Sequence, residues 1–117
     1  MRASRQLGMD GEAVVAARYE AEGYRILDRN WRCPRGEIDI VAARDGVVVF
    51  CEVKTRSSTR FGSPAEAVGP EKRARLRLLA TLWLRERGRP FRELRFDVAA
   101  VTASPHGMQV QIIDAAF

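Results

Sequence analysis

The sequence is poor in the residues that build disulfide frameworks and zinc sites. Its 117 residues include two cysteines, Cys33 and Cys51, and one histidine, His106. So few cysteines cannot staple a small secreted domain, and we expect free thiols, with Cys51 in the core, and a cytoplasmic protein. His106 stands between Pro105 and Gly107, in an expected surface loop. The sequence therefore predicts neither a disulfide scaffold nor a zinc site.

Long apolar runs are also missing. No apolar run is longer than residues 47–51, whereas a membrane-spanning helix needs roughly 20 apolar residues. At the amino terminus, Arg2 and Arg5 are followed by Asp10 and Glu12 rather than by an apolar secretory segment. The chain is 46% hydrophobic and 30% charged, a balance typical of globular proteins. We expect one domain over residues 1–117 and neither a disordered nor a collagen-like chain.

Lysine is scarce, whereas arginine is abundant. Of 20 basic residues, 18 are arginine and the others are Lys54 and Lys72; with 15 acidic residues, the net charge is +5. The planar guanidinium suits bidentate contacts to phosphate. A small arginine-rich domain is compatible with nucleic acid or an anionic membrane surface. A GC-rich genome would also favour arginine, so charge alone identifies no partner.

Hydrophobic periodicity and turn signals predict an order of helix, three strands, helix and strand. The predicted elements are a helix over residues 8–22, a strand over 24–29, a loop over 30–36, strands over 37–44 and 47–55, a loop over 57–64, a helix over 70–87 and a strand over 94–102. A short final strand over 109–113 is left open. Gly23 is expected to end the first helix. Leu76, Leu79 and Trp83 form an apolar stripe on the second. A helix before the fourth strand predicts a mixed sheet with helices on both faces.

The central hairpin has a register that follows from its turn. Asp-Gly between two β-rich segments is typical of a type I′ turn, which needs positive φ at both central residues. With residues 45–46 as the turn, Asp39 lies opposite Glu52 and Glu37 opposite Lys54. Alternation places these four side chains on one face. The same face is expected to carry Val41 and Phe50, and the opposite, more apolar face Ile38, Ile40, Val49, Cys51 and Val53.

The facing carboxylates of Asp39 and Glu52 would repel each other, and burial would strengthen the repulsion. Protonation of one carboxyl, a nearby cation such as Lys54, or a divalent metal between them would relieve it. Hydrated carboxylates at an exposed sheet edge are the simpler alternative, which helices on both faces disfavour. An Asp on one strand with Glu-Val-Lys on its neighbour is the spacing of metal-dependent nucleases. Hard oxygen ligands of this kind suit Mg²⁺ or Mn²⁺.

Glu12 lies on the helical stripe of Val15 and Tyr19, where an apolar residue is expected. A glutamate facing the interior would complete a metal site or hold a basic partner. A partly exposed glutamate in the first turn, favoured by the helix dipole, is the alternative. The sequence leaves both open.

Several segments together resemble the YraN-like family of small, largely uncharacterised bacterial proteins. They are Glu12, Gly36-Glu37-Ile38-Asp39, Val49-Phe50-Cys51-Glu52-Val53-Lys54-Thr55-Arg56 and Arg95-Phe96-Asp97-Val98, with Asn30-Trp31-Arg32 and Phe61-Gly62 fitting the same pattern. That family is similar to the PD-(D/E)XK nuclease superfamily, near the archaeal Holliday-junction resolvases. The resemblance implies an α/β, three-layer restriction-endonuclease-like fold with an αβββαβ core and a mixed central sheet.

The resemblance also implies hydrolysis of phosphodiester bonds in DNA, including branched or nicked DNA. Asp39, Glu52 and the Val53 carbonyl would hold Mg²⁺ or Mn²⁺, and Glu12 would be an accessory acid. The metal would polarise the phosphoryl oxygen and help to ionise water, while Lys54 would orient that water or stabilise charge on phosphorus. Phosphate positioning would fall to Arg32, Arg35, Arg56, Lys72 and Arg73.

Two other hypotheses stand beside the nuclease. One is a nucleic-acid-binding or protein-interaction module with the same fold and little or no cleavage; the other is a membrane-surface protein. The set of Asp39, Glu52 and Lys54 favours the enzyme, because a pure binder has no need for a repelling pair. The apolar stripe of the predicted helix over residues 70–87 is regular enough to pack in a protein core, which disfavours the membrane-surface hypothesis. We therefore expect DNA as the partner and no membrane association, and we leave a homodimer open.

Overall fold

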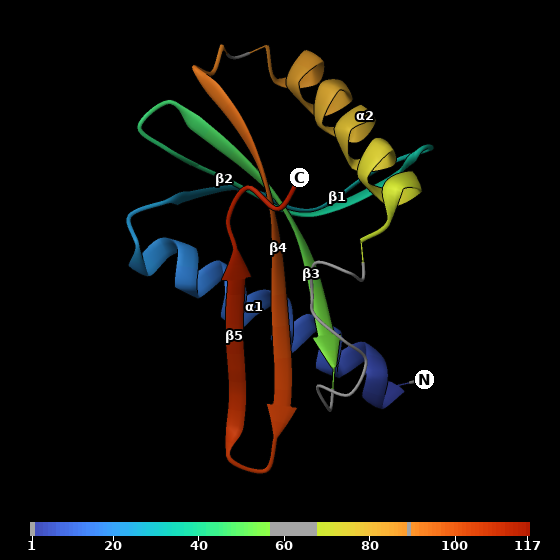
Figure 1. Ribbon diagram of the computed structural model, residues 1–117, viewed down its shortest axis with the longest axis vertical. Coiled ribbons are helices and arrows are strands. Elements are labelled where there is room, and N and C mark those ends of the chain that lie inside the picture. The colour runs from blue at the N-terminus through green and yellow to red at the C-terminus, as the bar shows by residue number, and fades with distance from the viewer. Residues whose placement is uncertain (1, 57–67, 89) are drawn as a thin grey trace.

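The computed structural model describes residues 2–56, 68–88 and 90–117, which form a mixed α/β structure (Figure 1). Its elements are α1 (Arg2–Ala21), β1 (Arg25–Cys33), β2 (Gly36–Arg44), β3 (Val47–Arg56), α2 (Pro70–Arg87), β4 (Glu93–Ser104) and β5 (Gly107–Ile113). The predicted loop over residues 57–64 lies outside the described residues. Neither of the described helices is long and apolar enough to cross a bilayer.

The strands form one five-stranded mixed sheet in the order β1-β2-β3-β4-β5. The pairs β1–β2, β2–β3 and β4–β5 are antiparallel, whereas β3 and β4 are parallel. Parallel neighbours need a crossover connection, and α2 lies in the connection between β3 and β4. The predicted mixed sheet is confirmed.

The two helices cover opposite faces of the sheet. Phe50 packs with the α2 residues Leu79 and Trp83, whereas its neighbour Cys51 packs with Tyr19 of α1. Successive side chains of a strand point to opposite faces, so these contacts place the helices on either side. Figure 1 shows α1 passing behind the sheet. Burial of Leu76, Leu79 and Trp83 confirms the stripe predicted for the second helix.

The turn geometry confirms the central hairpin. Asp45 and Gly46 have φ values of 51° and 81°, as a type I′ turn requires. The register runs from Arg44–Val47 to Ile40–Cys51, as predicted. Gly23, with φ of 89°, follows α1 as expected.

The prediction of a loop over residues 30–36 is wrong. Strand β1 continues to Cys33, and a turn of only two residues, Pro34 and Arg35, leads into β2. Asn30 has a φ of 53°, so its loop-like conformation is a local irregularity inside a strand. Pairing with β2 holds this segment extended, as the Trp31–Ile38 pair shows.

The face assigned to Ile38 is also wrong. Ile38 packs on the α2 side with Val41, whereas Ile40 packs on the α1 side. Residues 38 and 40 would share a face in a regular strand, so the alternation breaks around Asp39. The pairing of β2 with β3 ends at Ile40–Cys51, while its pairing with β1 continues to Cys33–Gly36. The N-terminal part of β2, before Ile40, therefore turns away from β3 and follows β1 (Figure 1).

Candidate active site

The candidate site lies where β2 and β3 diverge. Asp39 directly precedes Ile40, the first residue of β2 that pairs with β3, so the predicted Asp39–Glu52 position lies one step past the Ile40–Cys51 pair. The Asp39 side chain reaches across the gap, and its Oδ2 accepts a hydrogen bond from the Val53 amide at 2.9 Å. A carboxylate thus takes the place of a ladder carbonyl at the opening between the strands.

Glu52 is the buried acid of this site. It belongs to β3 and is 7% exposed. Both neighbouring lysines contact its Oε1: Lys72 Nζ lies 2.5 Å away and Lys54 Nζ 3.5 Å away. Lys54 comes from the same strand, whereas Lys72 comes from the first turn of α2. The two ammonium groups offset the cost of burying the Glu52 charge.

The electrostatics of Asp39 differ from those of Glu52. Burial, and after it the Glu52 charge, raise the pKa of Asp39 to about 7, although the hydrogen bond from the Val53 amide lowers it. Near neutral pH, Asp39 therefore exchanges a proton readily. Two of the arrangements expected to relieve the repulsion are therefore present. The raised pKa of Asp39 favours its protonation, and the ammonium groups of Lys54 and Lys72 neutralise Glu52.

The two lysines shift in opposite directions. Burial and the adjacent Lys72 ammonium lower the pKa of Lys54, although the Glu52 charge raises it. Burial alone would lower the pKa of Lys72, but its contacts with Glu52 and Lys54 raise it. Lys54 is thus the lysine that gives up a proton more easily, whereas Lys72 stays charged beside Glu52.

Glu12 faces this cluster from α1. Because α1 begins at Arg2, Glu12 lies in the middle of the helix, and the alternative of a first-turn glutamate is wrong. Its Oε1 is buried and has no hydrogen-bond partner. Burial raises the pKa of Glu12 against the opposing charge of Arg29, and Glu37 and Glu52 raise it as well. An unpartnered buried oxygen is costly to keep and typical of a functional position.

Gly11 is a site residue that sequence reasoning missed. A Cβ at this position would overlap the side chain of Thr55 on β3, so the glycine lets α1 approach the strand beside Glu12. Glycine inside a helix destabilises it relative to alanine, and such a glycine usually has a packing reason. The glycine within the helical pattern was the signal that could have found it.

The five residues predicted to position phosphate have different surroundings. Arg32 pairs with Glu37 at 3.0 Å, and Arg35 is exposed in the turn after β1. Arg56 ends β3 and is half-buried. Arg73 donates to the Val68 carbonyl at 2.9 Å. Lys72 is the member of the set that contacts Glu52.

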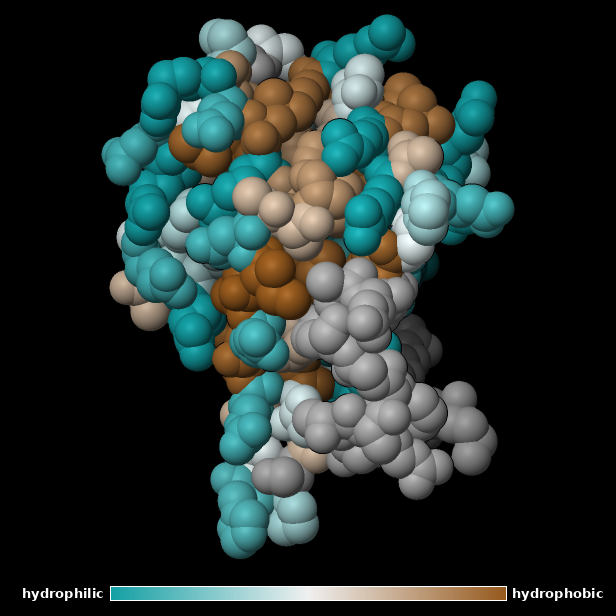
Figure 2. Space-filling model, viewed as in Figure 1, coloured by the Kyte–Doolittle hydropathy of each residue, from teal (hydrophilic) through white to brown (hydrophobic). Residues whose placement is uncertain are grey.

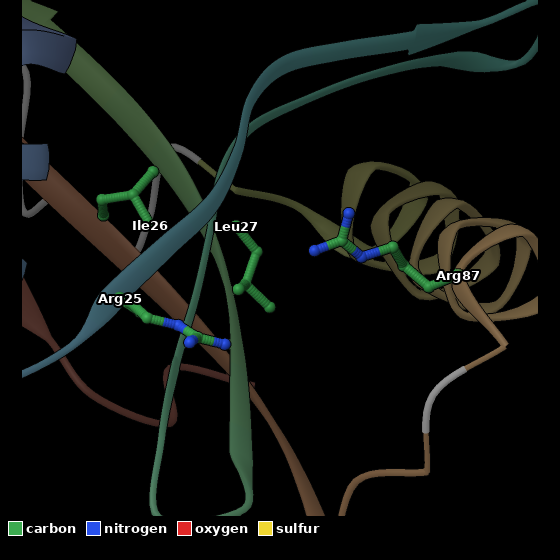
Figure 3. A pocket seen from close by; sticks show the side chains of 4 residues that line it. All are labelled: Arg25, Ile26, Leu27 and Arg87. Carbon is green, nitrogen blue, oxygen red and sulfur yellow. The ribbon is translucent and has the colours of Figure 1, made fainter.

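A separate hollow of about 480 Å³ lies between β1 and the last turn of α2 (Figure 3). It is lined by Arg25, Ile26, Leu27 and Arg87. Figure 3 shows the guanidinium of Arg87 pointing towards Leu27. The Arg25 side chain lies beside Leu27, and Ile26 points away from Arg87. Arg87 ends α2, whereas Lys72 lies in its first turn, so this hollow is about 20 Å along the helix from Lys72.

The donor set available to a metal is small. Among residues 2–56, 68–88 and 90–117, no group of three or more His, Cys, Asp or Glu side chains is placed to hold a metal ion. Asp39 and Glu52 supply carboxylate oxygens, which suit Mg²⁺ or Mn²⁺. The unpartnered oxygen of Glu12 adds negative potential nearby. The donor chemistry fits a hard cation, although Glu52 is already paired with two ammonium groups.

Fold and site together describe a mixed α/β protein with a carboxylate–lysine cluster where two strands part. Residues 11–101 match the model of uncharacterised protein family UPF0102, and the chain belongs to this family. It is 52% identical over 119 residues to a UPF0102 protein of Frankia alni, covering 100% of this chain and 98% of the relative. A UPF0102 protein of Moorella thermoacetica is 57% identical over 97 residues, covering 83% of this chain and 81% of the relative.

Proposed function

We propose that this protein is a metal-dependent endonuclease that hydrolyses phosphodiester bonds in DNA, including branched or nicked DNA. Its fold would be the restriction-endonuclease-like αβββαβ core, to which β5 adds an edge strand. The element order and the mixed sheet support this assignment. So does the resemblance of the segments around Asp39, Glu52 and Lys54 to the PD-(D/E)XK nucleases.

The carboxylate pair is the observation that carries the proposal. Asp39 and Glu52 come from adjacent strands at the gap between β2 and β3, and the charge of Glu52 raises the pKa of Asp39. Burying a carboxylate that repels its neighbour destabilises a protein, so such pairs cluster at functional sites. A divalent cation would turn that repulsion into binding energy.

Each residue of the site has a distinct role in this proposal. Asp39 and Glu52, with the Val53 carbonyl, would hold Mg²⁺ or Mn²⁺, which would supply Lewis-acid activation of the phosphoryl group and of water. Lys54, whose pKa is lowered by burial, would hold a water by hydrogen bonding or stabilise charge on the phosphoryl oxygens. Glu12 would take up or release a proton near the attacking water.

The distribution of charge supports DNA as the partner. Helix α2 contains six basic and two acidic residues, so it carries +4 of the net +5 of the chain. Several of its arginines are exposed: Arg75, Arg77, Arg85 and Arg87. Figure 2, viewed as in Figure 1, shows hydrophilic side chains protruding over the region of α2. A basic helix beside the site would attract the phosphate backbone.

Cleavage assays test the proposal directly. The purified protein is incubated with branched, nicked, linear and single-stranded DNA, with Mg²⁺, Mn²⁺ or EDTA. We expect metal-dependent cleavage that Asp39→Asn abolishes and that Lys54→Ala lowers by about 10²- to 10³-fold. Asp45→Asn is the matched control, because Asp45 is an exposed acid and Asn-Gly also suits a type I′ turn. Cleavage by Asp39→Asn at the wild-type rate would refute the assignment.

A nucleic-acid-binding module with little or no cleavage is the second candidate. One observation favours it: Lys54 and Lys72 already balance the charge of Glu52 without a metal. The repelling pair is therefore weaker evidence for an enzyme than the sequence alone indicates. DNA binding that is unchanged by EDTA, together with no cleavage of any substrate, would favour this module.

A further inference from the structure

Lys72 occupies an unusual place in α2. It is the third residue of the helix, where the macrodipole favours anions and disfavours cations. The helix also has no side-chain cap, because its N-cap is Gly69. Helix geometry therefore gives no reason for a lysine at this position. The 2.5 Å contact between Lys72 Nζ and Glu52 Oε1 gives such a reason.

Lys72 and Lys54 compete for one oxygen. Both ammonium groups contact Oε1 of Glu52, an atom that a metal bound to this carboxylate would also need. A divalent cation there would bring two further positive charges into contact with two ammonium groups. Such crowding of like charge is unfavourable, so at least one lysine has to leave.

We propose that Lys72 is an exchangeable counter-ion that holds Glu52 in the metal-free protein and is displaced when a divalent cation binds. This inference rests on the proposed function, because it assumes that Asp39 and Glu52 bind the metal. Lys72 is the lysine that leaves, since it reaches Glu52 from α2, whereas Lys54 is two residues away on the same strand. Once released, its ammonium group lies beside the site and is available to a phosphate.

Lys72 is thus a positioning residue, and its removal has two expected effects. Without it, the buried Glu52 has one cation fewer, so the metal-free protein melts at a lower temperature. The same loss makes the site more negative, so Mn²⁺ binds more tightly, on the order of tenfold. A purely structural lysine would lower the melting temperature and leave Mn²⁺ affinity unchanged or weakened.

The experiment measures binding of Mn²⁺ alone by titration calorimetry, and the melting temperature in EDTA and in Mn²⁺. The variants are Lys72→Met, Lys72→Arg and Arg75→Met, without DNA. Lys72→Arg keeps the charge and should retain the wild-type affinity. Arg75→Met removes the same charge from an exposed position one turn further along α2, and controls for general electrostatics.

Tighter Mn²⁺ binding by Lys72→Met, with wild-type affinity in Arg75→Met, supports the exchange. Equal or weaker binding by Lys72→Met overturns it while leaving the proposed metal site intact. Equal tightening in both variants also overturns it, because the effect would then be a general one. If neither the wild type nor Lys72→Met binds Mn²⁺, both the exchange and the metal site are refuted.

Discussion

Replacing Asp39 with Asn should stabilise the metal-free protein above neutral pH. Burial and Glu52 raise the pKa of Asp39 from its ordinary value of 3.8 to about 7. An acid with a raised pKa binds its proton more tightly in the folded state. Its contribution to stability is therefore fully present below about pH 4 and lost as pH rises through about 7.

The size of the effect follows from the shift of about three pKa units. At 1.36 kcal/mol per unit, complete ionisation of Asp39 costs about 4 kcal/mol. Between pH 5 and 8, the wild type should lose about 2–3 kcal/mol of unfolding free energy through this carboxyl. Asn resembles the protonated acid and does not titrate, so the Asp39→Asn variant should lack this loss.

Urea unfolding in EDTA at pH 5 and pH 8 measures this difference. The stability of Asp39→Asn relative to the wild type should increase by about 2–3 kcal/mol between the two pH values. Asp45→Asn, in an exposed turn, should stay within about 0.5 kcal/mol of the wild type at both. Parallel pH dependence in the wild type and Asp39→Asn would show that the carboxylate pair is not under electrostatic strain.

Two further predictions concern packing and DNA binding. Gly11→Ala should destabilise the protein by about 1–3 kcal/mol in urea unfolding, because the added methyl overlaps Thr55, and a second change, Thr55→Ala, should recover part of the loss. If Thr55→Ala does not restore any unfolding free energy, the overlap with Thr55 is not the cause of the destabilisation by Gly11→Ala. DNA affinity should fall linearly with salt on logarithmic axes, and Arg32→Ala should weaken binding and flatten the slope by about 0.9; binding independent of salt would contradict phosphate contacts.

Local chemistry was enough to predict the central hairpin. Asp45-Gly46 selects a two-residue turn, and this turn sets the register of every pair from Arg44–Val47 to Ile40–Cys51. The burial of Leu79 and Trp83 followed equally well from helical spacing. These features depend on a few neighbouring residues, so a single sequence contains the information.

The divergence of β2 from β3 was not predictable in the same way. It depends on β1, which continues through Asn30 to Cys33 and draws the start of β2 away from β3. Residues 30–36 contain turn-forming residues and resemble a loop when the partner strand is unknown. The same omission explains the wrong face of Ile38 and the ladder that ends before Asp39.

The contact between Lys72 and Glu52 was not predictable from the sequence, because the two residues are distant in the chain. Charge and spacing identify Lys72 only as one more basic residue on a helix, and phosphate binding was the natural hypothesis. The contact with Glu52 exists because α2 crosses between β3 and β4 and brings its first turn to this end of β3. Predicting such a pair requires the packing of α2 on the sheet, which hydrophobic periodicity does not specify.

The acids buried in this protein differ in how fully hydrogen bonds satisfy them. Asp97 is fully buried, and it accepts four hydrogen bonds: one from the Tyr19 hydroxyl, two from Arg95 and one from the Ala115 amide. Such a carboxylate is satisfied and holds β4, α1 and the segment after β5 together. Like Asp39, Asp97 lies in one of the segments that resemble the YraN-like family. Its four hydrogen bonds, however, leave no oxygen of the carboxylate without a partner.

Asp39 and Glu12, unlike Asp97, are not surrounded by hydrogen-bond donors. The hydrogen bond to Asp39 comes from the Val53 amide, while one oxygen of Glu12 is buried without a partner. Both have a raised pKa, in each case chiefly because of burial. The sequence pattern treats all of these acids alike, whereas their hydrogen bonds distinguish them. Among the acids compared, Asp39 and Glu12 have fewer partners than Asp97, and a cation bound beside them would stabilise the protein by neutralising their charge.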